Sequence, residues 1–403
     1  MQNKPKLRFK EFNDEWQVKK LGDIGELRNG IAKGNDSFGH GHKFINLQDV
    51  FGKDALYNSD YGLVETTEQE RRLNNLQQGD VIFVRSSVKP TGVGLPSVVM
   101  EDLEDTVFSG FLIRFREHEK CLNLSYKKYC FIVDNFRKEV LKRSSTSANT
   151  NINQDNLSVI RFNVPSLPEQ QKIAEFLSKV DEVIAEREAE VKDLEQKKKG
   201  LMQKLFSQQL RFTDSNNQPY PDWKETQIGK ICKTFSGGTP SVTCEKYYNG
   251  DIPFIKSGEI HSENTEVFIT KEGLDNSSAK LVEKGDLLFA LYGATSGEVD
   301  ISRIDGAINQ AILCIRSDEI NLTYLKNILN FNKDKILCKY LQGGQGNLSA
   351  EIVKSLTFIF PTPDEQEKIA NVLSKLDELI EEKKALLSDW QLFKKGLLQQ
   401  MFV

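Results

Sequence analysis

The sequence predicts an α/β (α+β) protein in which two globular mixed α/β blocks are joined by two long helices that pair as an antiparallel coiled coil. One phrase occurs twice: residues 168–187 read PEQQKIAEFLSKVDEVIAER, and residues 364–383 read DEQEKIANVLSKLDELIEEK. The offset is 364 − 168 = 196 residues, and it holds without a gap from 152–206 to 348–402. Each copy follows a separate block of about 150 residues. We therefore expect an internal repeat with pseudo-two-fold symmetry.

The repeat extends into the two blocks and sets the expected domain boundaries. Leu7-Arg8-Phe9 returns at residues 210–212, Trp16 returns as Trp223, and Gly79-Asp80 returns as Gly285-Asp286. The offsets of these pairs differ from 196, so the blocks share a frame but differ in loop length. We expect a first recognition block at 1–164, a central helix at 165–207, a second recognition block at 208–360 and a C-terminal helix at 361–403. Divergent loops on a shared frame favour two different specificities, although a duplicated core with idle loops stays open.

Short apolar runs bounded by turn residues predict the strands of each block. They lie at residues 80–84 and 111–115, and again at 286–290 and 311–315. Helical spacing occurs at residues 126–141 and 322–341. A last strand at 160–164 or 356–360 ends each block, because the following Pro165 or Pro361 cannot donate to a sheet.

A long helix is predicted after each of these prolines. Pro168 and Asp364 suit the helix starts, and Glu169 and Glu365 are expected to stabilise the positive end of the helix dipole. The second copy has its proline one residue earlier, at Pro363, so the two starts are expected to differ slightly. At about 38 residues, each helix would be roughly 57 Å long.

Apolar residues at heptad spacing predict that the helices pair. The seam consists of Ile173, Leu177, Val180, Ile184, Val191, Leu194, Leu201 and Leu205 in the first helix, and Ile369, Leu373, Leu376, Ile380, Leu387, Trp390, Leu397 and Met401 in the second. Basic residues interrupt it at matching positions, Arg187/Lys383 and Lys198/Lys394. They indicate either a seam that bends or meets further helices, or side chains whose charged ends reach solvent.

Composition limits the classes of function. The net charge is −4; residues 1–164 carry 24 basic and 22 acidic side chains, and residues 225–360 carry 14 and 17. A chain that reads nucleic acid with this balance must use local basic loops and a partner that supplies phosphate contacts. Six cysteines without a C-x-x-C pair predict free thiols, and no apolar run predicts a membrane span or a secretory signal. We expect a cytoplasmic protein.

Motifs for catalysis or cofactor binding were not found. The sequence has no G-x-x-x-x-G-K-[ST], no N-P-P-[FY] and no G-x-G-x-x-G after a strand. Pro221-Asp222 has no [DE]-x-K close behind it, so a nuclease site is not predicted. His40 and His42 lie in a glycine-rich run without further ligands at suitable spacing, which favours a solvated loop. We expect no catalytic residues, no metal and no cofactor in this chain.

The sequence resembles the specificity subunit of bacterial Type I restriction–modification enzymes. The resemblance rests on the doubled P-x-x-E-Q-x-K-I-A-x-x-L-S-K-x-D-E-x-I phrase and on the W…LG and G-D phrases of each half. It also rests on the residues that precede the doubled phrase, with Phe162 and Pro165 in the first copy and Phe358 and Pro361 in the second. It covers essentially the whole chain. It implies that each block is a target recognition domain for half of a bipartite, asymmetric site in double-stranded DNA. It also implies that two modification subunits dock on the helices and methylate adenine with S-adenosylmethionine, and that restriction subunits add ATP-driven cleavage. A non-catalytic chain is implied.

Loops near the predicted strands supply the candidate DNA-binding residues, since Arg, Lys, Asn and Gln can bond base edges. In the first block these are Arg85, Lys89, Thr91, Lys142, Arg143, Asn149 and Asn151; in the second they are Thr239, Tyr292, Thr295, Ser296, Lys339, Gln342, Gln345 and Asn347. In each block one loop follows the G-D strand and another precedes the final strand. Asn151 and Asn347 could instead turn the chain into that strand.

Two readings stay open beside DNA recognition. One is a structural or adhesion scaffold that carries two ligand modules on a coiled coil. The other is a stand-alone nuclease or methyltransferase, which the missing motifs disfavour. Under the DNA reading, antiparallel helices would act as a ruler that holds the half-sites about one to one and a half helical turns apart.

Overall fold

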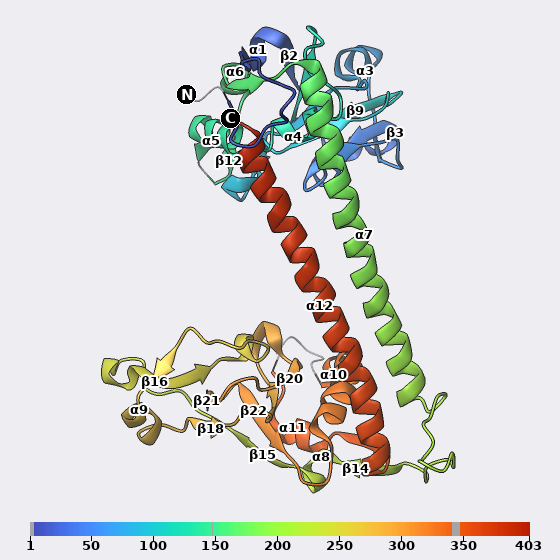
Figure 1. Ribbon diagram of the computed structural model, residues 1–403, viewed down its shortest axis with the longest axis vertical. Coiled ribbons are helices and arrows are strands. Elements are labelled where there is room, and N and C mark those ends of the chain that lie inside the picture. The colour runs from blue at the N-terminus through green and yellow to red at the C-terminus, as the bar shows by residue number, and fades with distance from the viewer. Residues whose placement is uncertain (1–3, 147, 341–346) are drawn as a thin grey trace. The chain divides into compact units, whose positions relative to one another are not determined.

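The computed structural model describes residues 4–146, 148–340 and 347–403 (Figure 1). The chain divides into two compact units. The first unit consists of Met1–Glu188 and Leu386–Val403, and the second consists of Ala189–Ala385. Each unit therefore contains one α/β block and a part of each long helix.

The first unit is built on a five-stranded sheet of order β2-β10-β6-β8-β4, a three-stranded sheet β5-β3-β9 and the pair β1-β13. Its strands are β1 (Gln17–Lys20), β2 (Gly25–Asn29), β3 (Phe38–Ile45), β4 (Ala55–Leu56), β5 (Gly62–Val64), β6 (Val81–Val84), β7 (Ser86–Ser87), β8 (Pro96–Val99), β9 (Thr106–Phe108), β10 (Leu112–Glu117), β11 (Ser145–Thr146), β12 (Thr150–Asn151) and β13 (Arg161–Val164). Its shorter helices are α1 (Leu21–Ile24), α2 (Leu47–Val50), α3 (Glu68–Asn74), α4 (Lys127–Cys130), α5 (Asp134–Arg143) and α6 (Gln154–Ser158).

The second unit repeats this plan with sheets of order β15-β22-β19-β20 and β17-β16-β21-β18 and the pair β14-β23. Its strands are β14 (Lys224–Gln227), β15 (Lys233–Ser236), β16 (Tyr248–Ile255), β17 (Phe268–Ile269), β18 (Lys280–Val282), β19 (Leu287–Ala290), β20 (Val299–Ile301), β21 (Gly306–Ile308), β22 (Ile312–Arg316) and β23 (Thr357–Phe360). Its shorter helices are α8 (Ile228–Ile231), α9 (Lys271–Asp275), α10 (Leu322–Tyr340) and α11 (Ala350–Ser355).

The predicted strands and the internal repeat are confirmed. β6, β10, β19 and β22 lie where the apolar runs placed them, and β13 and β23 end before Pro165 and Pro361. Equivalent strands also pair alike: β3 pairs with β9 and β16 with β21 in parallel, and β3 and β16 each have an antiparallel neighbour on the other side, β5 and β17. The prediction of one helical stretch over 126–141 was too simple, because the structure has two helices there, α4 and α5, separated at residues 131–133.

The two long helices are α7 (Leu167–Phe206) and α12 (Pro363–Met401). Since 363 − 167 = 196, they begin at equivalent positions, and the expected difference between their starts does not occur. Proline is tolerated at both places, as the second residue of α7 and the first of α12, because the first helical N–H groups have no intrahelical partner.

The glutamates at these helix starts accept side-chain hydrogen bonds, in addition to the expected interaction with the helix dipole. Glu169 is 1% exposed and accepts two hydrogen bonds from the Arg8 guanidinium (2.7 and 2.8 Å) and one from Trp16 Nε1 (3.2 Å). The carboxylate thus fixes the N-terminal segment to the start of α7. The L-R-F and W phrases of the sequence are explained by this clamp.

The second unit contains the same clamp. Glu365 is fully buried and accepts hydrogen bonds from Arg211 (3.1 and 2.8 Å) and from Trp223 Nε1 (3.0 Å). The glutamine after each glutamate is buried as well, and the side chain of Gln366 binds the amide of Asn321 and the carbonyl of Pro361. The E-Q pair of the repeated phrase is therefore a structural signature.

Parts of α7 and α12 lie antiparallel in each unit. In the first unit Asp181 contacts Lys394 (2.5 Å) and Glu188 contacts Gln391 (3.3 Å), so residue numbers rise along α7 as they fall along α12. In the second unit Glu190 contacts Lys383 (3.0 Å), and Lys198 forms an ion pair with Asp377. The coiled-coil prediction is confirmed.

The lysines of the seam form ion pairs, which neither proposed interpretation had anticipated. Lys198 with Asp377 and Lys394 with Asp181 are the same pair in the two copies, at the offset of 196. All four side chains are partly buried. Placing a carboxylate opposite each lysine lets the seam tolerate a charge and fixes the register of the two helices.

The C-terminal end of each long helix completes the core of one block. The end of α12 packs into the first unit, and the end of α7 packs into the second unit. Leu397, Met401 and Phe402 belong to the main core of the first unit, where the Phe402 ring stacks on Tyr126 with centroids 5.6 Å apart. In the second unit the equivalent Phe206 ring contacts Tyr324 edge to face, with centroids 5.8 Å apart. The seam residues Ile173, Leu177, Val180, Val191, Leu205, Ile369, Leu373, Ile380, Leu397 and Met401 are buried, and Ile184, Leu194, Leu201, Leu376, Leu387 and Trp390 are partly buried.

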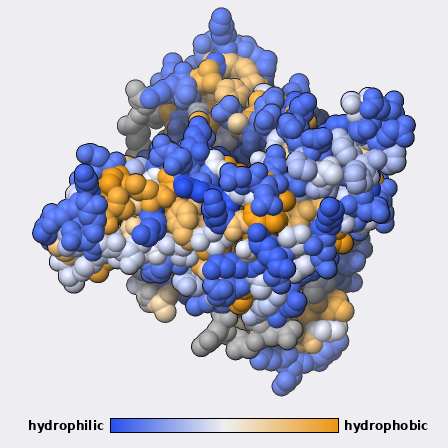
Figure 2. All heavy atoms as spheres, turned by 90° about the horizontal axis from the view of Figure 1, so that it is seen from below, coloured by the Kyte–Doolittle hydropathy of each residue, from blue (hydrophilic) through white to orange (hydrophobic). Residues whose placement is uncertain are grey.

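The face drawn in Figure 2 is largely hydrophilic, and its apolar residues form separate patches. Among the described residues, no helix has the length and apolar character needed to cross a membrane.

Candidate nucleic-acid interface

Two of the predicted loops of the first unit lie side by side. β12 pairs with β7 and with β11, which joins the loop after β6 to the segment before α6 in a small sheet. The amide of Ile152 donates to the carbonyl of Arg85 (3.0 Å). Residues 85–92 and the described residues of 142–151, which are 142–146 and 148–151, were predicted separately and form one surface, which we call the first loop face.

The candidate residues of the first loop face differ in how freely their side chains can reach a ligand. Lys89, Thr91, Lys142 and Asn149 are exposed. Arg85 is partly buried, and its Nη1 donates to the carbonyl of Gly110 (3.1 Å).

Arg143 and Asn151 bond to groups close to them in the sequence. The Arg143 guanidinium forms an ion pair with Glu139 on the same helix. The Asn151 amide donates to the carbonyl of Asn149 (3.0 Å), in keeping with the alternative structural role for this residue.

The second unit brings the equivalent segments together. The amide of Leu348 donates to the carbonyl of Leu291 (2.9 Å), the counterpart of the bond between Ile152 and Arg85. Residues 292–297 and 347–348 thus form a second loop face. Tyr292 packs partly buried against the main core of the unit, and Thr295 is partly buried.

Other candidates of the second unit are placed as follows. Ser296 is buried, and its hydroxyl donates to the carbonyl of Leu291 (3.0 Å), so it serves the loop itself. Thr239 is exposed, and its hydroxyl donates to Oε1 of Gln310 (2.7 Å). Lys339 is exposed near the end of α10, and Asn347 is exposed. The two other predicted residues, Gln342 and Gln345, lie outside the described residues.

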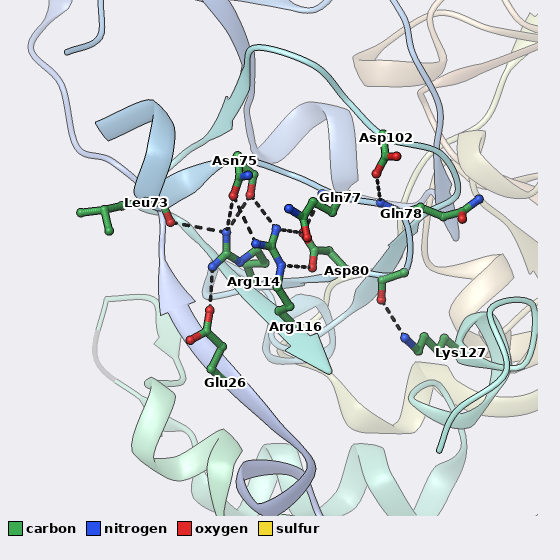
Figure 3. Close-up of polar contacts among 11 residues, drawn as sticks. Glu26, Leu73, Asn75, Gln77, Gln78, Asp80, Asp102, Arg114, Arg116 and Lys127 are labelled. Atoms are coloured by element: carbon green, nitrogen blue, oxygen red, sulfur yellow. Dashed lines mark hydrogen bonds and ion pairs between the residues drawn. The ribbon is translucent and has the colours of Figure 1, made fainter. Parts of the chain in front are cut away.

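The strand that leads to the first loop face is held by the G-D phrase (Figure 3). Gly79 has φ of +89°, a conformation that glycine adopts without strain. Asp80 then accepts hydrogen bonds from the Arg116 guanidinium (2.7 and 2.6 Å) and from the amide of Gln77 (2.9 Å). These bonds tie the start of β6 to β10.

The second G-D phrase acts in the same manner. Gly285 has φ of +102°, and Asp286 accepts hydrogen bonds from Arg316 (2.7 and 2.6 Å) and from the amide of Glu283 (2.8 Å). Burial opposes ionisation of Asp286, but the hydrogen bonds and charge of Arg316 outweigh it and hold the pKa of this carboxyl below its ordinary value. A charged Asp286 therefore supports the strand at neutral pH.

Acidic side chains close to the second loop face are neutralised from within the unit. Glu298 forms an ion pair with Lys333, and Asp300 lies 3.7 Å from Lys326. His261 approaches both carboxylates, Asp300 at 2.9 Å and Glu298 at 3.5 Å. Its hydrogen bond with Asp300 raises the pKa of His261 above the ordinary value although burial opposes this. Repulsion of an anionic ligand is thereby reduced.

A third segment of the first loop face was missed by the sequence analysis. The turn at residues 109–111 accepts the Arg85 backbone amide at the carbonyl of Phe111 (2.8 Å), and also the Arg85 guanidinium at Gly110. The turn residues Ser109-Gly110 next to a strand were the available signal. In the described part of the chain, no group of three or more His, Cys, Asp or Glu residues could hold a metal ion.

Comparison with known proteins identifies relatives over the whole chain. The model of the family "Type I restriction modification DNA specificity domain" matches twice, at residues 13–196 and 220–388. A protein of Methanocaldococcus jannaschii, provisionally named the MjaX type I restriction enzyme specificity subunit, is 25% identical over 399 residues, which cover 95% of this chain and 92% of the relative. The EcoR124I/EcoR124II type I restriction enzyme specificity subunit of Escherichia coli is 28% identical over 224 residues, 53% of each chain.

A similar fold is found among solved structures. The S subunit of a Type I restriction–modification system from M. genitalium superposes with a TM-score of 0.59 at 15% identity, over 99% of each chain.

Proposed function

Because the chain belongs to the Type I restriction–modification DNA specificity family, we propose that it is the sequence-specific DNA-recognition subunit of such a complex. Each recognition block reads one half of a bipartite, asymmetric site in double-stranded DNA. The blocks are residues 1–164 and 208–360, and the helices at 165–207 and 361–403 form the scaffold. The chain itself is non-catalytic. It acts in the cytoplasm with modification subunits that methylate adenine and restriction subunits that translocate and cleave DNA.

The observation that carries this function is the repeated loop face. In both units the backbone bond between the loop after the G-D strand and the segment before the last strand is the same, at 3.0 and 2.9 Å. The side chains on these loops differ: Arg85 and Lys89 in the first unit correspond in place to Leu291 and Tyr292 in the second. One frame with two sets of side chains supports recognition of two different half-sites.

The long helices supply the spacing in this proposal. α7 has 40 residues and would be about 60 Å long at 1.5 Å per residue. The test inserts one heptad into each helix at the boundary between the two units along the chain, between Glu188 and Ala189 and between Ala385 and Leu386. With the modification subunits present, a footprint should show unchanged half-sites and a spacer longer by about three base pairs, since seven residues add roughly 10 Å.

The control for this insertion is a heptad added to one helix alone, which should disrupt the paired seam and weaken DNA binding. A changed base sequence in the half-sites with an unchanged spacer would contradict the proposal that the helices set the distance between the half-sites. A wild-type complex that protects only one short uninterrupted sequence would contradict the proposed function. Absence of any DNA-dependent shift at low salt, with the candidate subunits present, would favour the scaffold without a nucleic-acid role.

A repeated polar helix face supports docking of two copies of one partner. Lys179 and Glu182 on α7 are exposed. Among the described residues, neither side chain has a hydrogen-bond or ion-pair partner. Identical residues, Lys375 and Glu378, occupy the equivalent positions of α12 and are also exposed. In the first unit this face borders a groove of about 560 Å³ lined by Asn123, Ser125, Gln171, Ala174, Glu175, Ser178, Lys179 and Glu182. We assign these faces to the two modification subunits.

Charge reversal tests this assignment. The double variant K179E/E182K should bind one modification subunit in place of two in native mass measurements, with at least about tenfold weaker binding at the altered face. K375E/E378K should lose the other subunit, and the fourfold variant should lose both. Lys192→Glu, an exposed change at a position that differs between the copies, is the matched control and should retain both. Unchanged stoichiometry in the fourfold variant would refute the assignment.

A further inference from the structure

The turn at residues 109–111 has a counterpart in the second unit. In the first unit the amide of Leu112 donates to the carbonyl of Ser109 (2.9 Å), and the amide of Phe111 donates to the Ser109 hydroxyl (3.3 Å). The turn precedes β10 and touches the first loop face through the bond from the amide of Arg85 to the carbonyl of Phe111 (2.8 Å).

The turn at residues 309–311 repeats each of these bonds. The amide of Ile312 donates to the carbonyl of Asn309 (3.3 Å), and the amide of Ala311 donates to the Asn309 side chain (3.0 Å). The amide of Leu291 donates to the carbonyl of Ala311 (2.7 Å). The backbone of the turn and its attachment to the loop face are therefore the same in both units.

The side chains on the two turns are of opposite character. Phe111 is 60% exposed, whereas the equivalent Ala311 is 9% exposed. The second turn instead presents the exposed amide of Gln310, where the first has Gly110. One turn thus offers an apolar ring and the other a hydrogen-bonding group, each at the same place beside its loop face.

The exposure of Phe111 calls for a reason because of where it occurs. Single exposed apolar residues are common on protein surfaces and need no explanation. Here, however, Val88 on the adjoining loop is 81% exposed, and these two are the most exposed large apolar side chains in the described part of residues 1–166. Both belong to segments joined to Arg85, so apolar surface gathers where the candidate polar residues lie.

We propose that Phe111 is a specificity-determining residue that contacts the 5-methyl group of a thymine in the half-site read by the first unit. This inference rests on the proposed function. The thymine methyl is the apolar group that a base pair presents in the major groove, and phenylalanine is suited to contact it. Gln310 at the equivalent turn can bond a base edge, so the same element discriminates differently in the two half-sites.

The test replaces each thymine of the first half-site, one at a time, by deoxyuridine, which lacks the methyl group. Duplexes carrying the site recovered by footprinting are titrated with the full complex. Wild type should lose affinity about fourfold at one thymine, since a methyl-sized group contributes roughly 0.8 kcal/mol. Phe111→Ala should bind the normal duplex about fourfold or more weakly and should no longer distinguish thymine from deoxyuridine at that position.

Two controls isolate the effect. Gln310→Ala should leave the thymine scan of the first half-site unchanged, and Val18→Ala, at a 50% exposed position on β1, should leave both half-sites unchanged. Thermal unfolding of Phe111→Ala should match wild type because the ring is exposed. A deoxyuridine profile that is the same in Phe111→Ala and wild type would overturn the inference and leave the proposed function intact. A uniform loss without loss of methyl discrimination would also overturn it. A complex without any sequence-specific site would instead refute the proposed function itself.

Discussion

Replacing Phe402 with alanine is expected to destabilise the first unit by about 3 kcal/mol or more, the usual cost of removing a buried aromatic ring. Phe402 is 8% exposed and contacts Trp16 (6.2 Å between centroids) and Tyr126 (5.6 Å). The effect should appear as early loss of hydrogen-exchange protection in β6 and β10, while β19 and β22 of the second unit keep theirs.

The matched variant and the control make this result specific. Phe206→Ala should affect the second unit in the opposite pattern, and less strongly, because Phe206 is only partly buried. Phe393→Ala, at a 50% exposed position on α12, should change the free energy of unfolding by no more than about 0.5 kcal/mol. Equal loss of protection in both units of the Phe402 variant would show that the helix end does not complete the first core in particular.

Replacing Glu169 with glutamine should have a similar cost, about 3 kcal/mol, at the low end of the range for removing one partner of a buried ion pair. The change leaves the Arg8 guanidinium, which is only 12% exposed, without its counter-charge. Chemical denaturation of the purified chain or complex measures the loss. Added protease should also cleave the N-terminal segment faster, because the clamp attaches residues 8–16 to α7.

Glu175→Gln is the control for the clamp, since Glu175 is exposed on the same helix. Glu365→Gln should reproduce the effect in the second unit, where Arg211 and Trp223 occupy the equivalent places. If Glu169→Gln were as stable as wild type, the carboxylate would be no more than a favourable charge at a helix start, as the sequence alone had indicated.

Local patterns explain why much of the fold was predictable. Strands such as β6 and β22 are continuous apolar runs, and the helices α7 and α12 carry a heptad repeat. The spacing of apolar residues along the chain therefore predicts which side chains of these elements are buried. The break between α4 and α5 was missed because helical spacing continues across it. The reach of Arg8 to Glu169 was missed because 161 residues separate the two partners.

The candidate site was predictable only in part, for a similar reason. Exposure of Lys89 and Lys142 follows from polar residues in loops, and the structure places their loops on one surface. The burial of Ser296 and the internal bonds of Arg85 depend on which carbonyl groups the fold brings near them. The turn that carries Phe111 belongs to this surface because β10 pairs with β6. No local pattern in the sequence specifies that pairing.

The sequence by itself determined the duplication, the strands, the paired helices and the loops that differ between the copies, because each of these is set by short-range spacing of apolar, polar and turn residues. Only the tertiary structure decided how distant segments meet: the clamps at the helix starts, the lysine–aspartate pairs of the seam and the helix ends that complete each core. These contacts join groups far apart in the chain, and their partners are selected by burial, where a charge or a ring must find its complement.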